Sequence, residues 1–492
     1  MTRERSDQGL NHVSLKQSDL YKQGTFALVV SLALSLLFLF YSYHVLAGLY
    51  FLFSAYQLIL ILRVRKDLLM TGEIQERTRR LGKIQLLSLL GGNVFTATFA
   101  FRVIKNDSQI DYTFAYYMLI TDFLVIGITL LNLFKPYVSN TFILSMSILI
   151  ALLIIDMIVI IILAKKGDQI RKNTTLFKSL AVFLFLTSLT GNIFRFILAY
   201  SLLLKSSDRD QSTVDKWHFF WVKLSKNFTA MIGLLFVVFI LSLSITSYGT
   251  FVTSFATVND YSMLLTEPNL TYPFGTDNFG RDVFSRIIFG GRVSLTIGVI
   301  TTVTPLVIGG ILGAVAGFYQ KAIDQTIMRI LDVLYAIPGI LLAIAIIAAF
   351  GSNTINLIIA LSVGSIPTYA RTMRANIMMV SNLDYIEAAR ALGESDAVIL
   401  IKHAIPNAFA PMIVRATLTI GSAVIATSSL SFLGLGVEPH IPEWGNVLRI
   451  GSSYLESEPY LAIIPGLAII LLVLAFNFLG DGLRDALDPK MN

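Results

Sequence analysis

The sequence contains no cysteine and few charged residues. Of its 492 residues, 14% are Asp, Glu, Lys or Arg, whereas 55% are hydrophobic. The absence of cysteine excludes disulfides, thiolate metal sites and a cysteine nucleophile. The apolar residues gather in blocks long enough to cross a bilayer, which takes a helix of about 20 residues. Together with the scarcity of charge, these blocks predict an integral membrane protein.

A basic surface interleaved with aromatic residues is also missing. The formal net charge is +7, but Lys and Arg are concentrated in the short links between apolar blocks. Because this is the charge bias of membrane-protein loops, no nucleic-acid partner is predicted. The first 22 residues are polar, and the apolar stretch that follows runs to Leu62 without a small-residue cleavage site. A cleaved signal peptide is therefore not expected.

Apolar runs predict an all-α membrane fold of about twelve transmembrane helices. Backbone polar groups cannot stay unpaired in lipid, so a helix is the expected form of every run. Six runs fall in residues 1–204, an N-terminal membrane extension whose role the sequence leaves open, and six fall in residues 228–492. The runs lie at 26–44, 45–62, 84–101, 113–134, 141–164 and 176–204, and then at 228–249, 293–318, 333–350, 354–370, 412–433 and 460–479.

A polar segment at 205–227 separates the two parts. Trp217, Phe220, Trp221 and Leu224 recur in it at helical spacing, beside several lysines. This pattern is typical of a helix that lies in the membrane interface. An aromatic linker without that role is the alternative.

Loop charges indicate which side of the membrane each loop faces. Loops 251–290 and 434–459 fall on one side, whereas the basic segment before 228, the link Lys321–Arg329, residues 371–403 and the C-terminus fall on the other. The basic side is the cytoplasmic one, and the N-terminus is expected there too.

One basic loop, 165–173, breaks this rule because it falls outside. The stretch LLSLLGGNVF at 86–95 is similar to FLTSLTGNIF at 185–194, and each follows a basic loop. Two inverted three-helix repeats would explain the exception, since a copied loop would then land on the opposite side. Chance similarity between apolar helices is the alternative.

Residues 385–408, YIEAARALGESDAVILIKHAIPNA, are too polar and too interrupted to cross a bilayer. Good helix formers at 385–392, a stop at Gly393 and a second helical stretch at 394–403 predict two helices lying flat on the cytoplasmic surface. Ala388 and Ala389 leave a patch without bulk, and Glu387 adds a charge at its edge. The pattern is typical of a docking element, and an ordinary interhelical linker is the alternative.

The order Glu387-Ala388-Ala389, then Gly393, then His403-x-Ile405-Pro406-Asn407 resembles the "EAA" coupling loop of ATP-binding-cassette importer permeases. Three further stretches resemble the C-type permease subunit of the dipeptide and oligopeptide branch. They are PFGTDNFGRDVFSRIIFGGRVSLTIG at 273–298, SFLGLGVEPHIPEWGNVL at 431–448 and FLGDGLRDALDP at 478–489. The resemblance covers roughly residues 215–492, places the coupling loop at 376–407, and makes 205–227 the position of an elbow helix. Members of the family usually lack an extension such as residues 1–204.

The resemblance implies a type I importer permease core in a multi-pass protein of the cytoplasmic membrane. Glu387, Ala388, Ala389 and Gly393 would contact a cytoplasmic ATPase subunit, while Pro406 and Asn407 would fix the return of the chain to the membrane. The implied partners are a homologous B-type permease, two ATPase subunits and an extracytoplasmic substrate-binding protein. The implied substrate is a dipeptide, an oligopeptide or a similar small solute. Nickel, other chelated metals and small glycosides stay open.

The chain itself is not expected to be an enzyme. It has no phosphate-cradling G-x-x-x-x-G-K-[ST] pattern, and its only Gly-Lys dipeptide, Gly82-Lys83, precedes Ile84. Magnesium and ATP are therefore expected on the partner ATPases, and no cofactor or metal on this chain.

The stretch PFGTDNFGRDVFSR carries charges at helical spacing. Asp277/Arg281 and Asp282/Arg286 are spaced for i,i+4 ion pairs, next to two glycines that permit tight turns. The structural interpretation is a capped entry to a membrane helix. The functional alternative is an external gate loop near the binding protein, with Asp277, Arg281 and Asp282 as its residues.

Three charged residues, Asp122, Asp156 and Arg195, lie inside predicted membrane helices of the extension. Charge in lipid costs about 2.5–3.5 kcal/mol or more, so each of them needs an explanation. They are predicted either to pair and lock the bundle or to bind a proton, a cation or another ligand. An ion-coupled secondary transporter, and a membrane scaffold or sensor built on the extension, are the alternative functions. Prolines in or beside the core helices, at 305, 338, 367 and 465, are expected to kink them.

Overall fold

The computed structural model describes residues 2–40, 43–105, 110–167, 170, 173–207 and 211–488. Every regular element in these ranges is a helix, which confirms the predicted fold class. The chain divides into two compact units. Unit 1 comprises Met1–Leu124 and Leu149–Val222, and unit 2 comprises Val125–Ile148 and Lys223–Asn492. A segment of the predicted extension therefore packs with unit 2.

Eight helices in the described ranges are long and apolar enough to cross a membrane, or nine if one bent pair forms a single span. The predicted total of twelve is not confirmed. The eight are Leu20–Leu39, His44–Thr71, Ile110–Phe134, Phe142–Lys166, Phe228–Thr250, Val283–Tyr319, Ala410–Phe432 and Tyr460–Leu487.

Unit 1 is a helical bundle built from the N-terminal part of the chain. Its helices are α1 (Thr2–Phe40), α2 (His44–Thr71), α3 (Glu76–Gln85), α4 (Val94–Lys105), most of α5 (Ile110–Leu130), most of α6 (Phe142–Lys166), α7 (Thr174–Thr187), α8 (Ile193–Ser206) and most of α9 (Gln211–Lys226). The predicted interfacial helix is confirmed as a helix by α9, in which Trp221 and Leu224 are buried. Residues 208–210 of the predicted linker lie outside the described residues.

Two predicted membrane helices of unit 1, at 84–101 and 176–204, are instead broken in the middle. In each, a short 3₁₀ turn, Leu86–Leu89 or Ser188–Thr190, leads to a glycine and then an asparagine before the next helix begins. Gly92 and Gly191 have φ of +74° and +89°, a conformation that stops a helix and suits glycine. The two stretches with similar sequences therefore share one local structure. This favours an internal repeat over chance similarity. Residues 168, 169, 171 and 172 of the basic loop 165–173 lie outside the described residues.

Unit 2 contains the permease-like part of the chain and a hairpin from the extension. The hairpin is the end of α5, a 3₁₀ turn Leu131–Phe134 and the start of α6. The remaining helices are α10 (Phe228–Thr250), α11 (Ser254–Thr257), α12 (Val283–Tyr319), α13 (Lys321–Tyr335), α14 (Gly339–Phe350), α15 (Thr354–Val380), α16 (Asp384–Ala391), α17 (Asp396–Val398), α18 (Ile405–Ala408), α19 (Ala410–Phe432), α20 (Trp444–Ser452) and α21 (Tyr460–Leu487).

The centre of unit 2 is the pair α12 and α15, which approach each other closely. A Cβ atom on Gly309, Gly313 or Gly317 of α12 would lie 2.6, 2.2 or 2.6 Å from a backbone oxygen of α15. Glycines at this four-residue spacing let two membrane helices touch along their backbones, where van der Waals contact replaces the missing hydrophobic effect. This contact fixes the helix that carries the polar loop at 381–409.

The predicted membrane helix of unit 2 at 333–350 is instead parts of two helices that meet at a sharp bend. The link expected at Lys321–Arg329 is part of helix α13, and α13 and α14 meet at an angle of 79°. Pro338 stands at the N-cap of α14. Because proline has no N–H and disfavours a helical residue before it, the chain turns sharply there. The other three prolines lie inside α12, α15 and α21.

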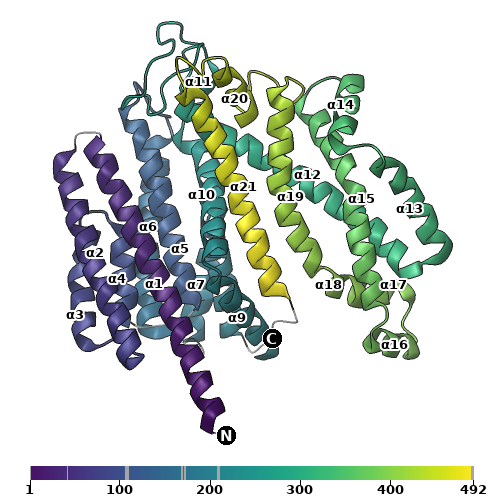
Figure 1. Cartoon of the computed structure of the whole chain (residues 1–492), viewed down its shortest axis with the longest axis horizontal. Helices are drawn as coiled ribbons and strands as arrows, with labels where there is room; N and C mark the ends of the chain where they lie inside the picture. Colours follow the sequence, from purple (N-terminus) through teal and green to yellow (C-terminus); the bar gives the residue numbers. More distant parts are fainter. Residues whose placement is uncertain are drawn as a thin grey trace. The chain divides into compact units, whose positions relative to one another are not determined.

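The polar segments of unit 2 gather at two opposite ends of its long helices. In Figure 1, α11 and α20 lie at one end of α10, α12, α19 and α21, whereas α16, α17 and α18 lie at the other. We call these the loop end and the coupling end. The loops at 251–282 and 434–443 thus share one end, as the charge pattern predicts, and residues 384–408 occupy the opposite one.

Candidate functional site

The coupling end contains the helix that the sequence predicts at 385–392. It is α16, whose first turn carries Asp384 and Glu387, acidic residues that suit a helix N-terminus. The helix ends at Gly393, with φ of +85°. The Gly393 amide donates to the Arg390 carbonyl at 3.0 Å and the Glu394 amide to the Ala389 carbonyl at 3.2 Å. This pair of bonds is a Schellman motif, so the predicted helix stop is confirmed.

The exposed face of α16 differs in one respect from the predicted docking patch. Glu387 and Ala388 are exposed, but Ala389 is only 9% exposed and belongs to the buried core of unit 2. Leu392, which the sequence did not single out, is 86% exposed at the tip of the helix. A leucine left this open is informative only in context, since scattered surface leucines are normal. Here it stands beside Glu387 and Ala388 on a protruding helix.

Below α16 an apolar core ties the loop to the membrane helices. Ile386 and Ala389 of α16 pack in one buried cluster with Met373 and Ile377 of α15 and with Met412 of α19. Burial of a side chain such as Ile386 contributes about 1.5–3 kcal/mol. Because the cluster joins three helices, a force on α16 reaches α15 and α19 directly.

The second helical stretch of the loop is present but irregular. It comprises α17, a π-helical turn Ile399–Ala404 and α18. The His403 Nε2 atom lies 2.9 Å from Glu394 Oε2, and the Asn407 side-chain amide donates to the His403 carbonyl at 2.7 Å. Pro406 stands in the first turn of α18, where its missing N–H does no harm. These contacts close the loop between Gly393 and the start of α19.

Asn407 also faces a cavity of about 540 Å³ at the coupling end. The cavity lies among α15, α18, α19 and α21, and its walls include Arg415, Arg484 and Asp488. Arginines present planar sets of N–H donors that match carboxylates. The walls of this cavity carry two cations and one anion.

The loop end confirms one of the two predicted ion pairs. Arg281 Nε donates to Asp277 Oδ2 at 2.9 Å, and both side chains are buried. The predicted Asp282–Arg286 pair is wrong, because Arg286 turns toward Asp277, at 3.6 Å, and donates to the Ala256 carbonyl. Asp282 instead caps α12 by accepting from the Ser285 amide at 3.0 Å. The capped helix entry is therefore the interpretation that the geometry supports.

The cation that pairs with Asp282 is Lys135, from the hairpin of the extension. Its Nζ atom lies 2.6 Å from Asp282 Oδ2, and the two side chains are 1% and 0% exposed. It also lies over the ring of Tyr272, 4.5 Å from the centroid. Burial lowers the pKa of the Lys135 ammonium, and attraction to Asp282 offsets only part of that shift. No sequence spacing could reveal this pair, since 147 positions separate its members.

Further contacts attach the same hairpin to the loop end. The Tyr137 ring stacks on Phe255 with centroids 4.6 Å apart, and its hydroxyl lies 2.9 Å from Ser254 Oγ. The Asn132 amide donates to the Thr250 carbonyl at 3.2 Å. The hairpin thus holds the C-terminal end of α10 and the turn that follows it.

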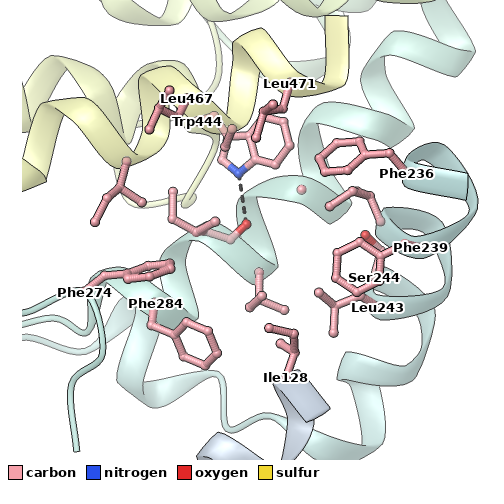
Figure 2. A pocket seen from close by; sticks show the side chains of 16 residues that line it. Ile128, Phe236, Phe239, Leu243, Ser244, Phe274, Phe284, Trp444, Leu467 and Leu471 are labelled. Carbon is pink, nitrogen blue, oxygen red and sulfur yellow. Dashed lines mark hydrogen bonds between the residues drawn. The ribbon is translucent and has the colours of Figure 1, made fainter. Parts of the chain in front are cut away.

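The loop end also contains an apolar cavity of about 350 Å³ (Figure 2). Trp444 forms one wall and donates from Nε1 to the Ile287 carbonyl at 2.9 Å, the bond drawn in Figure 2. A Cβ atom on Gly290 would lie 2.5 Å from the indole, so this glycine makes room for Trp444. Ser244 is the only lining residue with a polar side chain besides Trp444. The cavity offers no partner for the charged ends of a peptide.

In unit 1 the three predicted intramembrane charges come together. Arg195 of α8 pairs with Asp122 of α5 and, at 3.1 Å, with Asp156 of α6. Asn192 donates to Asp122 Oδ1 at 2.7 Å and joins the cluster, although the sequence did not single it out. Within the described ranges no three His, Asp or Glu side chains gather closely enough to hold a metal ion.

Comparison with known proteins gives a consistent result. The family described as "Binding-protein-dependent transport system inner membrane component" matches residues 309–492. The glutathione transport system permease protein GsiD of Pectobacterium atrosepticum is 42% identical over 285 residues, which cover 58% of this chain and 94% of that protein. GsiD of Escherichia coli O6:K15:H31 is 44% identical over 277 residues, covering 56% and 91%. A solved inward-facing structure of the MetNI methionine ABC transporter is 21% identical, with a TM-score of 0.35 over 42% of this chain and 97% of that one.

Proposed function

Because the chain belongs to the family of binding-protein-dependent transport system inner membrane components, the permeases of ATP-binding-cassette importers, we propose that it imports short peptides. Both GsiD relatives are named for transport of glutathione, a small tripeptide, which favours a peptide of similar size as the substrate. The energy comes from two separate ATPase subunits, and a B-type permease and an extracytoplasmic binding protein complete the importer. The multi-pass chain has its two termini in the cytoplasm.

The observation that carries this proposal is the surface of α16. Glu387, Ala388 and Leu392 form an exposed strip that combines a charge, a small residue and a large apolar residue. Such a strip fits a groove on an ATPase, where Ala388 allows close approach and Leu392 fills a pocket. Gly393 sets the angle at which the strip is presented, and Pro406 and Asn407 fix the return of the chain.

The buried side of α16 transmits its movement to the membrane helices. Ala389 and Ile386 anchor α16 in the core that also contains residues of α15 and α19. When the ATPases close on ATP and displace α16, these two helices move with it. The cavity beside Asn407 lies on this route, and its arginines suit the carboxylate of a peptide.

The test compares two leucines in equivalent local structures. Leu392 precedes Gly393 at the coupling end, and Leu433 precedes Gly434 at the loop end. Leu433 is 61% exposed, and both glycines have positive φ. We expect Leu392→Ser to lower recovery of the ATPases with the tagged chain at least tenfold, because a buried leucine at an interface contributes about 1.4 kcal/mol or more. Leu433→Ser should leave recovery unchanged.

Uptake of a labelled tripeptide by the reconstituted importer gives the second readout. Leu392→Ser should reduce ATP-driven uptake, while Leu433→Ser retains the ATPases whatever its effect on transport. Equal ATPase recovery from Leu392→Ser and the unaltered chain would contradict the docking assignment. If the ATPases were recovered but no peptide were taken up, the proposed peptide substrate would be wrong and the docking assignment would stand.

A further inference from the structure

The buried charge cluster of unit 1 has more acid than base. Three helices contribute to it: Asp122 lies on α5, Asp156 on α6 and Arg195 on α8. One guanidinium nitrogen, Nη2, donates to Oδ2 of both carboxyl groups. The other, Nη1, donates to the Thr187 carbonyl and to Thr190 Oγ1, at 3.3 and 3.0 Å. The three charged side chains are no more than 4% exposed.

Full ionisation would leave this cluster with a net charge of −1 inside a membrane bundle. The two carboxyl groups both accept from Nη2 through their Oδ2 atoms, so both are held at the same guanidinium nitrogen. Two carboxylates that share one site cannot both ionise without strong repulsion, which low dielectric increases.

The remaining charged groups of the surrounding helices do not supply a second cation. Arg195 is the only cation that acts on Asp122 or Asp156 among the described residues. The other charged groups with described side chains on these helices are Arg102 of α4, near Tyr116, Asp111 of α5 paired with Lys205 of α8, Lys178 of α7, and Lys165 and Lys166 in the last turn of α6.

The hydrogen bonds distinguish the two acids. Asp122 accepts on both oxygens, from Asn192 at Oδ1 and from Arg195 at Oδ2. Among the residues that the structure describes, Asp156 accepts a hydrogen bond only from Arg195, at Oδ2. Donors stabilise the ionised form of a carboxyl group, so Asp122 is the better anion and Asp156 the better site for a proton. Asn192 is fully buried, and its Oδ1 atom has no partner among the described residues, which leaves an acceptor beside the cluster.

We propose that Asp122, Asp156 and Arg195 form a proton-binding site that holds one proton at neutral pH, mainly on Asp156. The bound proton makes the cluster electrically neutral. The site belongs to the extension and is separate from peptide transport by unit 2, so the proposal does not rest on the proposed function.

The first half of unit 1 contains a neutral counterpart of this cluster. Asn93 occupies the position of Asn192 in the second broken helix, and Thr96 that of Arg195. Asn93 donates to Ser31 Oγ at 2.7 Å, and Ser54 does so at the same distance. Hydroxyl and amide groups satisfy one another here without a charge. The same helix break is thus stable without ionisable groups, so the acids of the second half are not required merely to form it.

Infrared spectroscopy of the full chain in detergent tests the proton directly. At neutral pH we expect the difference spectrum between the unaltered chain and Asp156→Asn to contain the carbonyl band of a protonated carboxyl group. Asp122→Asn should remove the same band, because the remaining Asp156 then pairs one to one with Arg195. Asp111→Asn is the matched control, since Asp111 already has Lys205 as its own partner and should contribute no such band.

Thermal unfolding of the same variants separates a proton site from a plain ion-pair network. Asp156→Asn should change Tm by less than about 3 °C, whereas the Asp122→Asn/Asp156→Asn double variant should lower it by about 10 °C, because Arg195 is then buried without an anion. Adding Arg195→Gln to the double variant should restore most of the loss. Absence of the carboxyl band, or a Tm loss in Asp156→Asn as large as in the double variant, would overturn the proposal.

Discussion

The two ends of unit 2 use one helix-ending motif in opposite surroundings. At the coupling end, Leu392 and Gly393 close α16, and a Cβ atom added to Gly393 would meet no atom within 4 Å. At the loop end, Leu433 and Gly434 close α19 with the same pair of backbone bonds, from Gly434 to Ser431 and from Leu435 to Leu430. There a Cβ atom would lie 2.6 Å from Arg449. The motif shapes both turns and exposes both leucines, but only Gly393 has open space around it.

This difference supports the proposed docking of a partner at the coupling end. At the loop end, buried charges pair within unit 2, since Asp277 pairs with Arg281 and Asp282 both caps α12 and pairs with Lys135. The coupling end instead leaves Glu387 and Leu392 exposed above a well-packed core. An exposed charge and leucine on a packed base are features of a docking surface, which supports the proposed contact at the coupling end.

The largest loss of stability is expected from a substitution in the tightly packed part of the loop end. Gly280 has φ of +73°, and a Cβ atom there would lie 1.7 Å from the Asp260 carbonyl oxygen. Backbone cannot yield as a flexible side chain does, so Gly280→Ala should destabilise unit 2 by more than about 4 kcal/mol. A large fall in Tm and in the yield of monodisperse protein would show it.

Gly351→Ala serves as the control for Gly280→Ala. Its φ of +90° and ψ of +154° suit glycine alone, but no atom lies within 4 Å of the added Cβ, so only backbone strain of about 1–3 kcal/mol is expected. Equal Tm values for the two variants would mean that the tight packing at Asp260 contributes nothing.

The next largest effect should come from separating the hairpin from the loop end. Lys135→Met keeps the length of the side chain but leaves Asp282 buried without its cation, at a cost of about 3 kcal/mol. Tm of the purified chain should fall accordingly. Asp282→Asn in the same background should recover stability, because asparagine is neutral and still caps a helix.

The control for the hairpin is the exposed ion pair between Arg390 and Asp396 at the coupling end. Arg390 Nε lies 3.8 Å from Asp396 Oδ1, and both side chains are more than half exposed. Arg390→Met should therefore leave Tm almost unchanged. If Lys135→Met also left Tm unchanged, the Lys135–Asp282 pair would not stabilise the loop end.

Local chemistry in the sequence predicted the parts of the site that depend on neighbours in the chain. The helix at α16, its stop at Gly393 and the Asp277–Arg281 pair all involve residues within five positions of each other. The burial of Ala389 and the Lys135–Asp282 pair depend on helices that meet only after folding, so spacing could not reveal them. Asp282 and Arg286 have the right separation, but capping of α12 and Lys135 compete successfully for the Asp282 carboxylate.

The sequence predicted the all-α fold class correctly, but it did not predict where individual helices are interrupted. Apolar composition identified the long membrane helices, because lipid demands both length and hydrophobicity. It did not locate the breaks at Gly92 and Gly191, because the apolar run was read as continuous, although Gly91-Gly92-Asn93 and Thr190-Gly191-Asn192 are clusters that favour turns. Pro338 was recognised as a source of a kink, but the turn of 79° also depends on α13 being a helix rather than a link.

Substitutions at Gly393 should have the smallest effect on stability. They also test the coupling end most directly. Gly393→Ala meets no steric obstacle and should cost only about 1 kcal/mol for its positive φ. It should nevertheless impair coupled uptake, because relaxing that strain rotates α16 relative to the rest of the loop. Gly393→Asn should retain more uptake than Gly393→Ala, since asparagine tolerates the left-handed conformation. Tm, ATP hydrolysis and uptake measured on the same reconstituted importer separate the two effects. If alanine and asparagine left uptake equally unimpaired, the angle set by Gly393 would not matter for coupling, and the exposed strip of α16 would have to act through Glu387 and Leu392 alone.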